Sequence, residues 1–160
     1  MRWLFPILLL ALDFSSKLFA IKFIAPLGYG TYPYGGVPIF SNVLGVSFSL
    51  NLIGNTGAAW GLFAGNPGAL FFVRLLIIGG FGFAMYFFDR PALKTIPLML
   101  IGAGAIGNAI DYLLYGHVID FFHFNFWGSS FPIFNFADSY ITIGAFCLLF
   151  SKPLFKARTN

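Results

Sequence analysis

Long apolar stretches alternate with short polar ones along this chain, and four of the apolar stretches reach the length that crosses a lipid bilayer. A membrane-spanning helix needs about 20 predominantly apolar residues. The pattern therefore predicts four transmembrane helices, at about residues 3–25, 69–88, 96–115 and 134–150. Two longer segments connect them, at about residues 26–68 and 116–133, and the length of the chain (residues 1–160) suits one membrane-embedded domain.

The first apolar stretch admits a second interpretation, because its run from Trp3 to Leu12 has the length of a signal-peptide core. Asp13 and Lys17 follow at once, however, and the apolar pattern then continues to Ala25. We therefore favour a membrane-spanning helix over a cleaved signal peptide. Asp13 and Lys17 are four residues apart, so on a helix they form an ion pair, which we interpret as structural, a contact in helix packing.

Two parts of the connecting segments alternate apolar and polar residues, which is typical of a half-buried strand. In the first part, the apolar residues Val46, Phe48, Leu50 and Leu52 alternate with Ser47, Ser49 and Asn51. In the second, Phe122, Phe124 and Phe126 alternate with His123 and Asn125. We expect a small sheet on the outer membrane face, with its apolar side toward lipid or the helices. Two loops with incidental alternation are the alternative.

Composition supports a membrane protein, since 59% of the residues are hydrophobic and only 9% are charged. A soluble domain averages about 25% charged residues. The net charge of +4 could indicate a nucleic-acid partner. The basic residues form no stripe, however, and gather at the ends of the apolar segments, so we expect no nucleic acid. The single cysteine excludes an internal disulfide.

Orientation follows from Lys and Arg, which favour the cytoplasmic side of a membrane. Basic residues lie before the first span, between the second and third, and after the fourth: Arg2, Arg90, Lys94, Lys152, Lys156 and Arg158. The segments 25–69 and 116–132 contain neither Lys nor Arg. The predicted fold class is thus an all-α membrane protein with four transmembrane helices, both termini cytoplasmic and a small β-sheet on the outer membrane face.

All five acidic residues are aspartates, and two of them, Asp120 and Asp138, lie at the borders of apolar segments. A carboxylate in such a place is costly unless it is paired, protonated or used in chemistry. The predicted topology brings both to a similar height near the outer face. Two carboxylates in contact share one proton, which suits peptide hydrolysis. The alternative is structural: each aspartate caps a helix end or binds a basic residue.

Other polar residues are predicted at the same height. Asn55 lies in the first outer segment, and Asn108 and Asp111 share one face of the third span because they are three residues apart. Glycines nearby, such as Gly104 and Gly107, allow helices to approach closely. These residues are candidates to surround the two carboxylates.

A metal site was considered for His117, Asp120 and His123, which recur every three residues. On a helix these side chains drift around the axis, and on a strand His117 and His123 share a face that excludes Asp120. Cys147 lies inside an apolar span, far along the chain from both histidines, which argues against a cysteine nucleophile. We therefore expect no metal and no other cofactor.

Five short motifs carry a resemblance to a known family. They are Asp13-Phe14-Ser15-Ser16-Lys17, Asn55-Thr56-Gly57-Ala58-Ala59-Trp60-Gly61, Gly107-Asn108-Ala109-Ile110-Asp111, Gly116-His117-Val118-Ile119-Asp120-Phe121 and Phe134-Asn135-Phe136-Ala137-Asp138-Ser139. The chain resembles the lipoprotein signal peptidases of bacteria, also called type II signal peptidases, over almost its whole length. Each motif alone is weak, but the five in this order among four spans are specific.

The resemblance implies an aspartyl endopeptidase of the bacterial inner membrane, with several spans and an active site near the outer face. It implies cleavage of prolipoproteins just before a cysteine that carries diacylglycerol. By the motif match, Asp120 and Asp138 are catalytic. Matched positions that bind substrate or support the site are Asn55, Gly57, Asn108, Asp111, Asn135 and Ala137. The expected partners are the prolipoprotein and membrane lipid, and we expect a monomer.

One residue departs from the family's pattern, since Tyr112 stands where Arg usually follows Asp111. Arg74 and Lys17 are candidate cations to compensate. Two other functions stay open from the residues alone. A transporter or channel would use polar groups at several depths, which Asp13 and Lys17 fit in part. A membrane scaffold without activity is supported only by Tyr112. The concentration of polar groups at the outer end favours the peptidase.

Overall fold

Four helices and a small antiparallel sheet make up the computed structural model, which describes residues 4–24, 36–56, 67–89, 92–150 and 156–157. The helices are α1 (Leu4–Phe23), α2 (Pro67–Phe87), α3 (Ala92–Tyr115) and α4 (Phe136–Leu149). The strands are β1 (Val37–Val43), β2 (Val46–Asn55), β3 (Phe88–Asp89), β4 (Val118–Phe126), β5 (Ser129–Ser130) and β6 (Lys156–Ala157).

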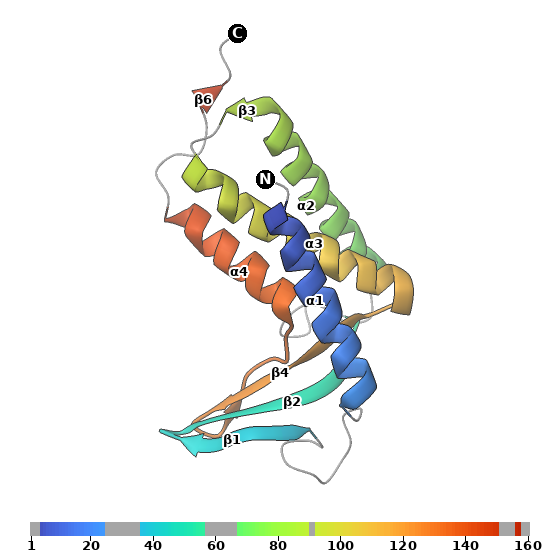
Figure 1. Cartoon of the computed structure of the whole chain (residues 1–160), viewed down its shortest axis with the longest axis vertical. Coiled ribbons are helices and arrows are strands. Elements are labelled where there is room, and N and C mark those ends of the chain that lie inside the picture. The colour runs from blue at the N-terminus through green and yellow to red at the C-terminus, as the bar shows by residue number, and fades with distance from the viewer. Residues whose placement is uncertain (1–3, 25–35, 57–66, 90–91, 151–155, 158–160) are drawn as a thin grey trace.

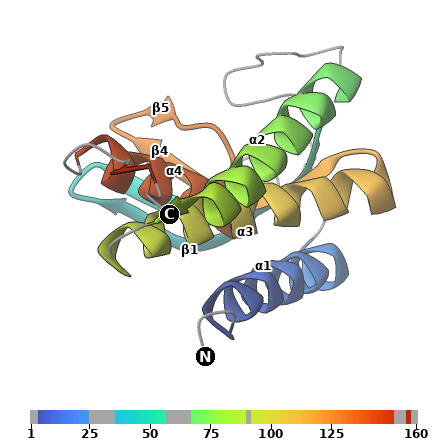
Figure 2. The ribbon, with the colours of Figure 1, turned by 90° about the horizontal axis from the view of Figure 1, so that it is seen from above.

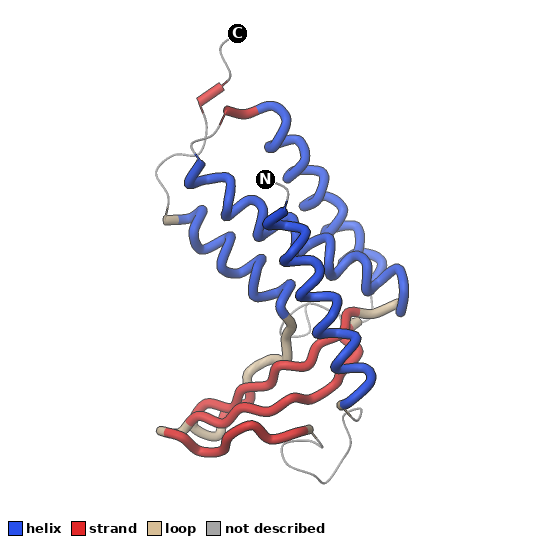
Figure 3. Tube along the Cα trace, viewed as in Figure 1, coloured by secondary structure: helices blue, strands red, loops and turns tan. Residues whose placement is uncertain are grey.

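The helices form a bundle with the larger sheet at one end (Figure 1). Helix α3 is central and packs against α1, α2 and α4, as the view from above also shows (Figure 2). The larger sheet has the strand order β1-β2-β4-β5, and the short pair β3–β6 lies at the opposite end of the bundle (Figure 3). The start of α1 and the end of α4 therefore lie away from the larger sheet.

The surface of the bundle is apolar, as a surface in contact with lipid would be. Leu4 and Leu8 of α1 and Phe72 and Leu76 of α2 are each more than half exposed. Among the described residues, α1 and residues Thr95–Tyr115 of α3 are long and apolar enough to cross a membrane. Exposed apolar side chains on this scale are costly in water, so the bundle suits a bilayer.

Helix α4 is shorter than the predicted span of 134–150. It has 14 residues, a rise of about 21 Å, whereas the hydrocarbon core is about 30 Å thick. The sequence did not reveal that the chain before α4 belongs to the sheet: Phe134 pairs with Phe122, and Asn135 is the N-cap. The first span is confirmed as one continuous helix through Asp13 and Lys17.

The sheet confirms both predicted strands and adds two that the sequence pattern did not reveal, the exposed edge strand β1 and the short strand β5. Strands β2 and β4 pair antiparallel, with Ser49 opposite His123 and Leu50 opposite Phe122. The register then shifts, so that Ile53 lies opposite Asp120. Strand β2 thus has one residue more than β4 in this interval, which is a β-bulge. Because opposite residues share a face, the bulge places Asn55 on the face of Asp120.

The sequence left open whether the apolar side of the sheet faces lipid or the helices, and the structure buries polar side chains of both strands. Ser49, Asn51 and His123 are all buried, whereas Phe48 and Phe124 are only half-buried and stack on each other at 4.5 Å between ring centroids. Their hydrogen bonds to one another offset much of the cost of burial, although Asn51 Oδ1 is buried without a partner among the described residues.

Small residues bring α3 and α4 into close contact. A methyl group at Gly104 would collide with the backbone carbonyl of Ala137, and one at Gly144 would meet the carbonyl of Pro97 at 2.6 Å. Backbones that approach this closely are typical of packed membrane helices. The contact fixes the first turn of α4 against α3, and this turn carries Asp138.

Candidate active site

Buried polar side chains from four different elements meet where the sheet joins the helices. Asp120 lies on β4 and Asp138 in the first turn of α4. The carboxamides Asn55, Asn108 and Asn135 come from the end of β2, from α3 and from the N-cap of α4. The fold thus brings together residues that are up to 83 positions apart in the sequence, from Asn55 to Asp138.

Asp120 is completely buried, and both of its carboxylate oxygens accept hydrogen bonds. Oδ1 accepts from Asn135 Nδ2 at 2.7 Å, and Oδ2 accepts from Asn55 Nδ2 at 2.7 Å. Burial raises the pKa of Asp120 well above its usual value, and the negative charge of Asp138 raises this pKa further. The two amide donors and the charge of Lys17 act in the opposite direction but do not prevail.

Asp138 is half-buried, in contrast to Asp120, and lies at the N3 position of α4. Its Oδ1 accepts a hydrogen bond from Asn108 Nδ2 at 2.7 Å. Its Oδ2 accepts from the backbone N–H of Asn135, which completes a capping box. Asp138 therefore does have the capping role that the sequence left open, and this role orients its carboxylate toward the junction.

Asn135 connects the two carboxylates. Its Oδ1 accepts from the backbone N–H of Asp138 at 2.9 Å, and its Nδ2 donates to Asp120 at 2.7 Å. The same Nδ2 also contacts Asn108 Oδ1 at 3.1 Å. One carboxamide therefore caps α4 and binds Asp120, so the position of Asp138 is coupled to that of Asp120.

A buried ion cluster lies beside this network. Lys17 Nζ contacts Asp13 Oδ2 at 2.7 Å and Asp111 Oδ2 at 2.8 Å. Asp13 in turn accepts from the backbone N–H of Ala137 at 2.9 Å, and Asp111 accepts from that of Ile119 at 3.1 Å. The sequence predicted the contact between Asp13 and Lys17. It offered Lys17 only as one of two candidate partners for Asp111, and here the contact is direct.

The arrangement of Asp120 and Asp138 can perform acid–base chemistry. A buried carboxyl group with a raised pKa, beside a half-buried one, can supply both a general acid and a general base. Of the predicted site residues, Asn55, Asn108, Asp111, Asn135 and Ala137 all lie in this network; Gly57 lies outside the described residues. In the described part of the chain, no three side chains of His, Cys, Asp or Glu gather as a metal site requires.

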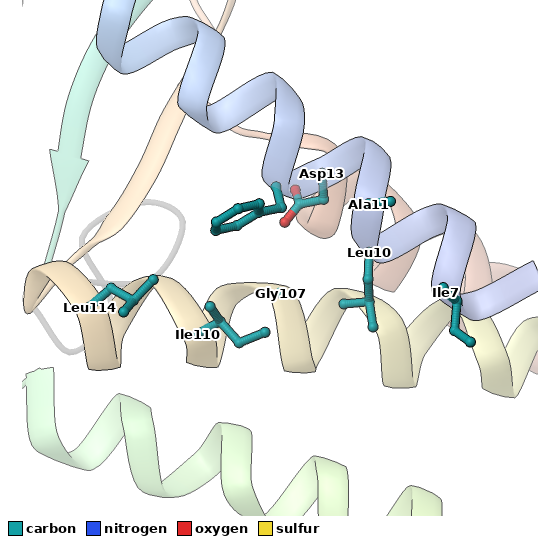
Figure 4. Close-up of a pocket in the computed structure, with 8 residues that line it drawn as sticks. Ile7, Leu10, Ala11, Asp13, Gly107, Ile110 and Leu114 are labelled. Atoms are coloured by element: carbon teal, nitrogen blue, oxygen red, sulfur yellow. The ribbon is translucent and has the colours of Figure 1, made fainter.

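A separate cleft of about 490 Å³ lies between α1 and α3 (Figure 4). Its walls are apolar, with Leu10 of α1 and Ile110 of α3 among them, and among the described residues Asp13 is the one carboxylate that lines it. Gly107 lies opposite Asp13, and a methyl group at this position would meet Asp13 Oδ2 at 2.6 Å. Neither Asp120 nor Asp138 lines this cleft, so it is distinct from the site of the two carboxylates.

Comparisons with known proteins agree with one another. A family model described as signal peptidase (SPase) II matches residues 5–154. The lipoprotein signal peptidase of Chlamydia pneumoniae is 35% identical over 147 residues, which cover 89% of this chain and 84% of that protein. The lipoprotein signal peptidase of Staphylococcus aureus is 39% identical over 99 residues, or 59% of each chain.

Solved structures share the fold as well. Two structures of a bacterial membrane enzyme superpose with TM-scores of 0.72 and 0.71, at 26% and 27% sequence identity. Each superposition covers 92% of this chain, with 84% and 89% of the other chain. The similarity therefore includes both the helical bundle and the sheet.

Proposed function

The chain belongs to the signal peptidase (SPase) II family, and we propose that Asp120 and Asp138 are its catalytic pair. As a member of this family the protein is an aspartic peptidase that removes the signal peptide from prolipoproteins. The observation that carries the proposed pair is the contrast between a fully buried Asp120 with a raised pKa and a half-buried Asp138, joined through Asn135.

In the proposed mechanism the pair holds one proton. The ionised carboxylate takes a proton from a water molecule, whose oxygen attacks the carbonyl carbon of the peptide bond. The protonated carboxyl group donates its proton to the carbonyl oxygen. When the tetrahedral intermediate collapses, the carbon–nitrogen bond breaks and the leaving amine receives the proton that came from water. One hydroxyl group of the intermediate returns its proton to the other carboxylate, which leaves a carboxylic acid as the second product. The pair then again holds one proton.

We further propose that the scissile bond precedes a cysteine that carries diacylglycerol. The site lies at the junction of an apolar bundle and a sheet whose Phe48, Phe122 and Phe124 form an aromatic surface. A lipid-modified residue at the membrane surface would reach this junction with its acyl chains still in lipid. The free amine of that cysteine is the leaving group.

Our proposed placement has four spans, both termini in the cytoplasm and the sheet on the outer face of the inner membrane. The support is the positive-inside distribution of Lys and Arg and the position of β3 and β6 opposite the larger sheet. We propose that the functional unit is a single domain that acts as a monomer.

The test uses purified protein in detergent with a diacylglyceryl-modified precursor and the same precursor unmodified. We expect cleavage of the modified precursor only. Asp120→Asn and Asp138→Asn should each lower kcat by at least about 10³-fold, since each removes one partner in proton transfer. Asp89→Asn is the matched control, because Asp89 lies in β3 at the far end of the bundle.

Two results would contradict the proposal. Near-normal cleavage by either purified Asp→Asn variant would exclude the pair. Equal cleavage of the unmodified precursor would exclude recognition of the lipid group, while leaving the pair in place.

A further inference from the structure

All three N–H donors of the Lys17 ammonium group are used within the buried ion cluster. Its ammonium group contacts Asp13 Oδ2 at 2.7 Å, Asp111 Oδ2 at 2.8 Å and Asn108 Oδ1 at 3.2 Å. An ammonium group carries three N–H donors, so all three have an acceptor. Lys17 is 1% exposed. It therefore has no donor left for substrate, and any role in the reaction passes through these three residues.

Two of the three acceptors lead directly to the segments that carry the proposed catalytic pair. Asp13 accepts from the backbone N–H of Ala137, the residue before Asp138. Asp111 accepts from the backbone N–H of Ile119, the residue before Asp120. Lys17 thus joins two carboxylates. Asp13 binds the backbone next to Asp138, and Asp111 binds the backbone next to Asp120.

The third acceptor leads to both catalytic side chains. Asn108 accepts from Lys17 with Oδ1, which orients its Nδ2 toward Asp138 Oδ1 at 2.7 Å. The same Oδ1 accepts from Asn135, whose Nδ2 also binds Asp120. The orientation of the Asn108 amide is therefore set by Lys17, and the two catalytic carboxylates depend on it.

Stability does not explain a buried cluster of this kind. Buried ion pairs contribute little net stability, because removing the charges from water costs about as much as their attraction returns. Apolar residues of similar size would serve the packing of α1 against α3 as well. The cluster also contains two aspartates for one lysine, so its charges do not cancel.

We propose that Lys17 is a positioning residue that aligns Asp120 with Asp138, and that its charge lowers the upper pH limit of the reaction. This role rests on the proposed function of the two aspartates. Lys17 acts on them through its contacts with Asp13, Asp111 and Asn108.

Charged groups near the pair come from the helices at the junction. Asp13 and Lys17 lie on α1, Asp111 on α3 and Asp138 itself on α4, while Tyr140, also on α4, interacts electrostatically with Asp13. The positive charge of Lys17 lowers the pKa of Asp120, against the larger effects of burial and of Asp138. Removing this charge therefore raises the pKa of Asp120, and the pair keeps its shared proton to higher pH.

The test replaces Lys17 by Met, which keeps the length of the side chain and removes its charge. We expect kcat to fall about 100-fold, as for a displacement of about 1 Å in reacting groups, with KM changed less than about threefold. The alkaline limit of the pH–rate profile should move to higher pH by about half a unit to one unit. Lys22→Met is the control: Lys22 is exposed on the same helix and should leave all three measurements unchanged.

Asp111→Asn removes a negative charge from the cluster, whereas Lys17→Met removes a positive one. The Asn oxygen can still accept from Lys17 and from the N–H of Ile119, but one negative charge is gone. We expect the alkaline limit to move to lower pH, since the charge of Lys17 is then less neutralised. This variant decides the question if Lys17→Met does not yield folded protein in detergent.

A kcat and a pH profile for Lys17→Met that match the wild type would overturn the proposal. Movement of the alkaline limit in the same direction in both variants would overturn the electrostatic part. Asp120→Asn, measured in parallel, separates this proposal from the proposed function. If it retains cleavage, the catalytic pair is wrong and the role of Lys17 is wrong with it; if it does not, the Lys17 results stand alone.

Discussion

Two buried polar clusters lie on opposite faces of strands β2 and β4, and they differ in charge. On one face, Asp120 belongs to a network with several ionisable groups. On the other, Asn51 Nδ2 contacts Ser49 Oγ at 2.9 Å and His123 Nδ1 at 2.8 Å. The other ring nitrogen of His123 contacts Ser130 Oγ at 2.7 Å. Burial lowers the pKa of His123, so the second cluster is neutral near pH 7.

The comparison indicates that the buried charges serve the proposed reaction and are not needed to join the strands. The neutral cluster joins β2, β4 and β5 at the modest cost of hydrogen-bonded polar groups. Joining strands therefore does not require buried carboxylates. The charged cluster is much more costly to bury, and it occurs where the proposed reaction needs a carboxyl group with a raised pKa. We expect substitutions in the charged cluster to lower activity, and substitutions in the neutral one to lower stability.

The largest effect among the amides is expected at Asn135, which caps α4 and binds Asp120. Asn135→Ala should lower kcat about 100-fold or more and should also destabilise the protein by about 1 kcal/mol through loss of the cap. Asn135→Ser separates the two roles, because a serine hydroxyl still caps the helix but does not replace the amide donor to Asp120. Steady-state kinetics and thermal unfolding in detergent measure both.

For Asn135→Ser we expect most of the lost stability to return while kcat stays low. If kcat recovered together with stability, the amide would act only as a cap, and the distinction between the clusters would fail at this residue.

A smaller effect is expected at Asn55, which donates to Asp120 Oδ2 and, unlike Asn135, does not cap α4. A hydrogen bond to a charged group contributes about 1.5–3 kcal/mol, so Asn55→Ala should lower kcat/KM by about 10- to 100-fold. Because this bond lowers the pKa of Asp120, its loss should move the alkaline limit of the pH–rate profile to higher pH. Asn125→Ala on β4, opposite Ser47 and far from Asp120 along the strand, is the control. An unchanged alkaline limit would argue against the assigned contact.

The smallest effect on activity is expected in the neutral cluster. His123→Leu leaves the buried Asn51 without its ring partner, which should cost about 1–3 kcal/mol of unfolding free energy. Cleavage per folded molecule should stay within about twofold of the wild type. A loss of kcat as large as that at Asn55 would mean that the two clusters are not functionally separate.

The same variant tests the pH dependence of stability. A lowered pKa in the folded state means that the stability contributed by neutral His123 is full above the unfolded value of about 6.5 and is lost as pH falls through the folded value. The raised pKa of Asp120 acts in the opposite direction. The difference in Tm between wild type and His123→Leu should therefore shrink as pH falls from 7 to 5.

The sequence predicted the helices from the length of their apolar stretches. It predicted two strands from the alternation of apolar and polar residues. The first span, expected at 3–25, is α1 at Leu4–Phe23. The start of α4 was less well predicted, since Phe134 is as apolar as the helix that follows, and only its pairing with Phe122 removes it from the helix. Strand β1 was missed because Val37–Val43 is exposed along its whole length and has no clear alternation.

The site was predicted mainly by its residue types and motifs, and its connections came from the fold. Asp120 and Asp138 stand out in the sequence because carboxylates are rare beside apolar segments. No pattern shows that Lys17 binds Asp111, because the contact depends on the packing of α1 against α3. The burial of His123 was also hidden: alternation predicts which residues share a face but not what covers that face.

Because of the β-bulge in β2, the number of residues between Ser49 and Asn55 determines which face of the sheet Asn55 lies on. Counting in steps of two from Ser49 assigns Asn55 to the same face, yet the two residues belong to opposite clusters because of the extra residue between Leu50 and Ile53. Losing that residue would turn Asn55 away from Asp120 without altering any side chain of the site. This stretch can therefore vary in composition but not in length, and an alignment gap within it would signal a different active site even if every motif letter were retained.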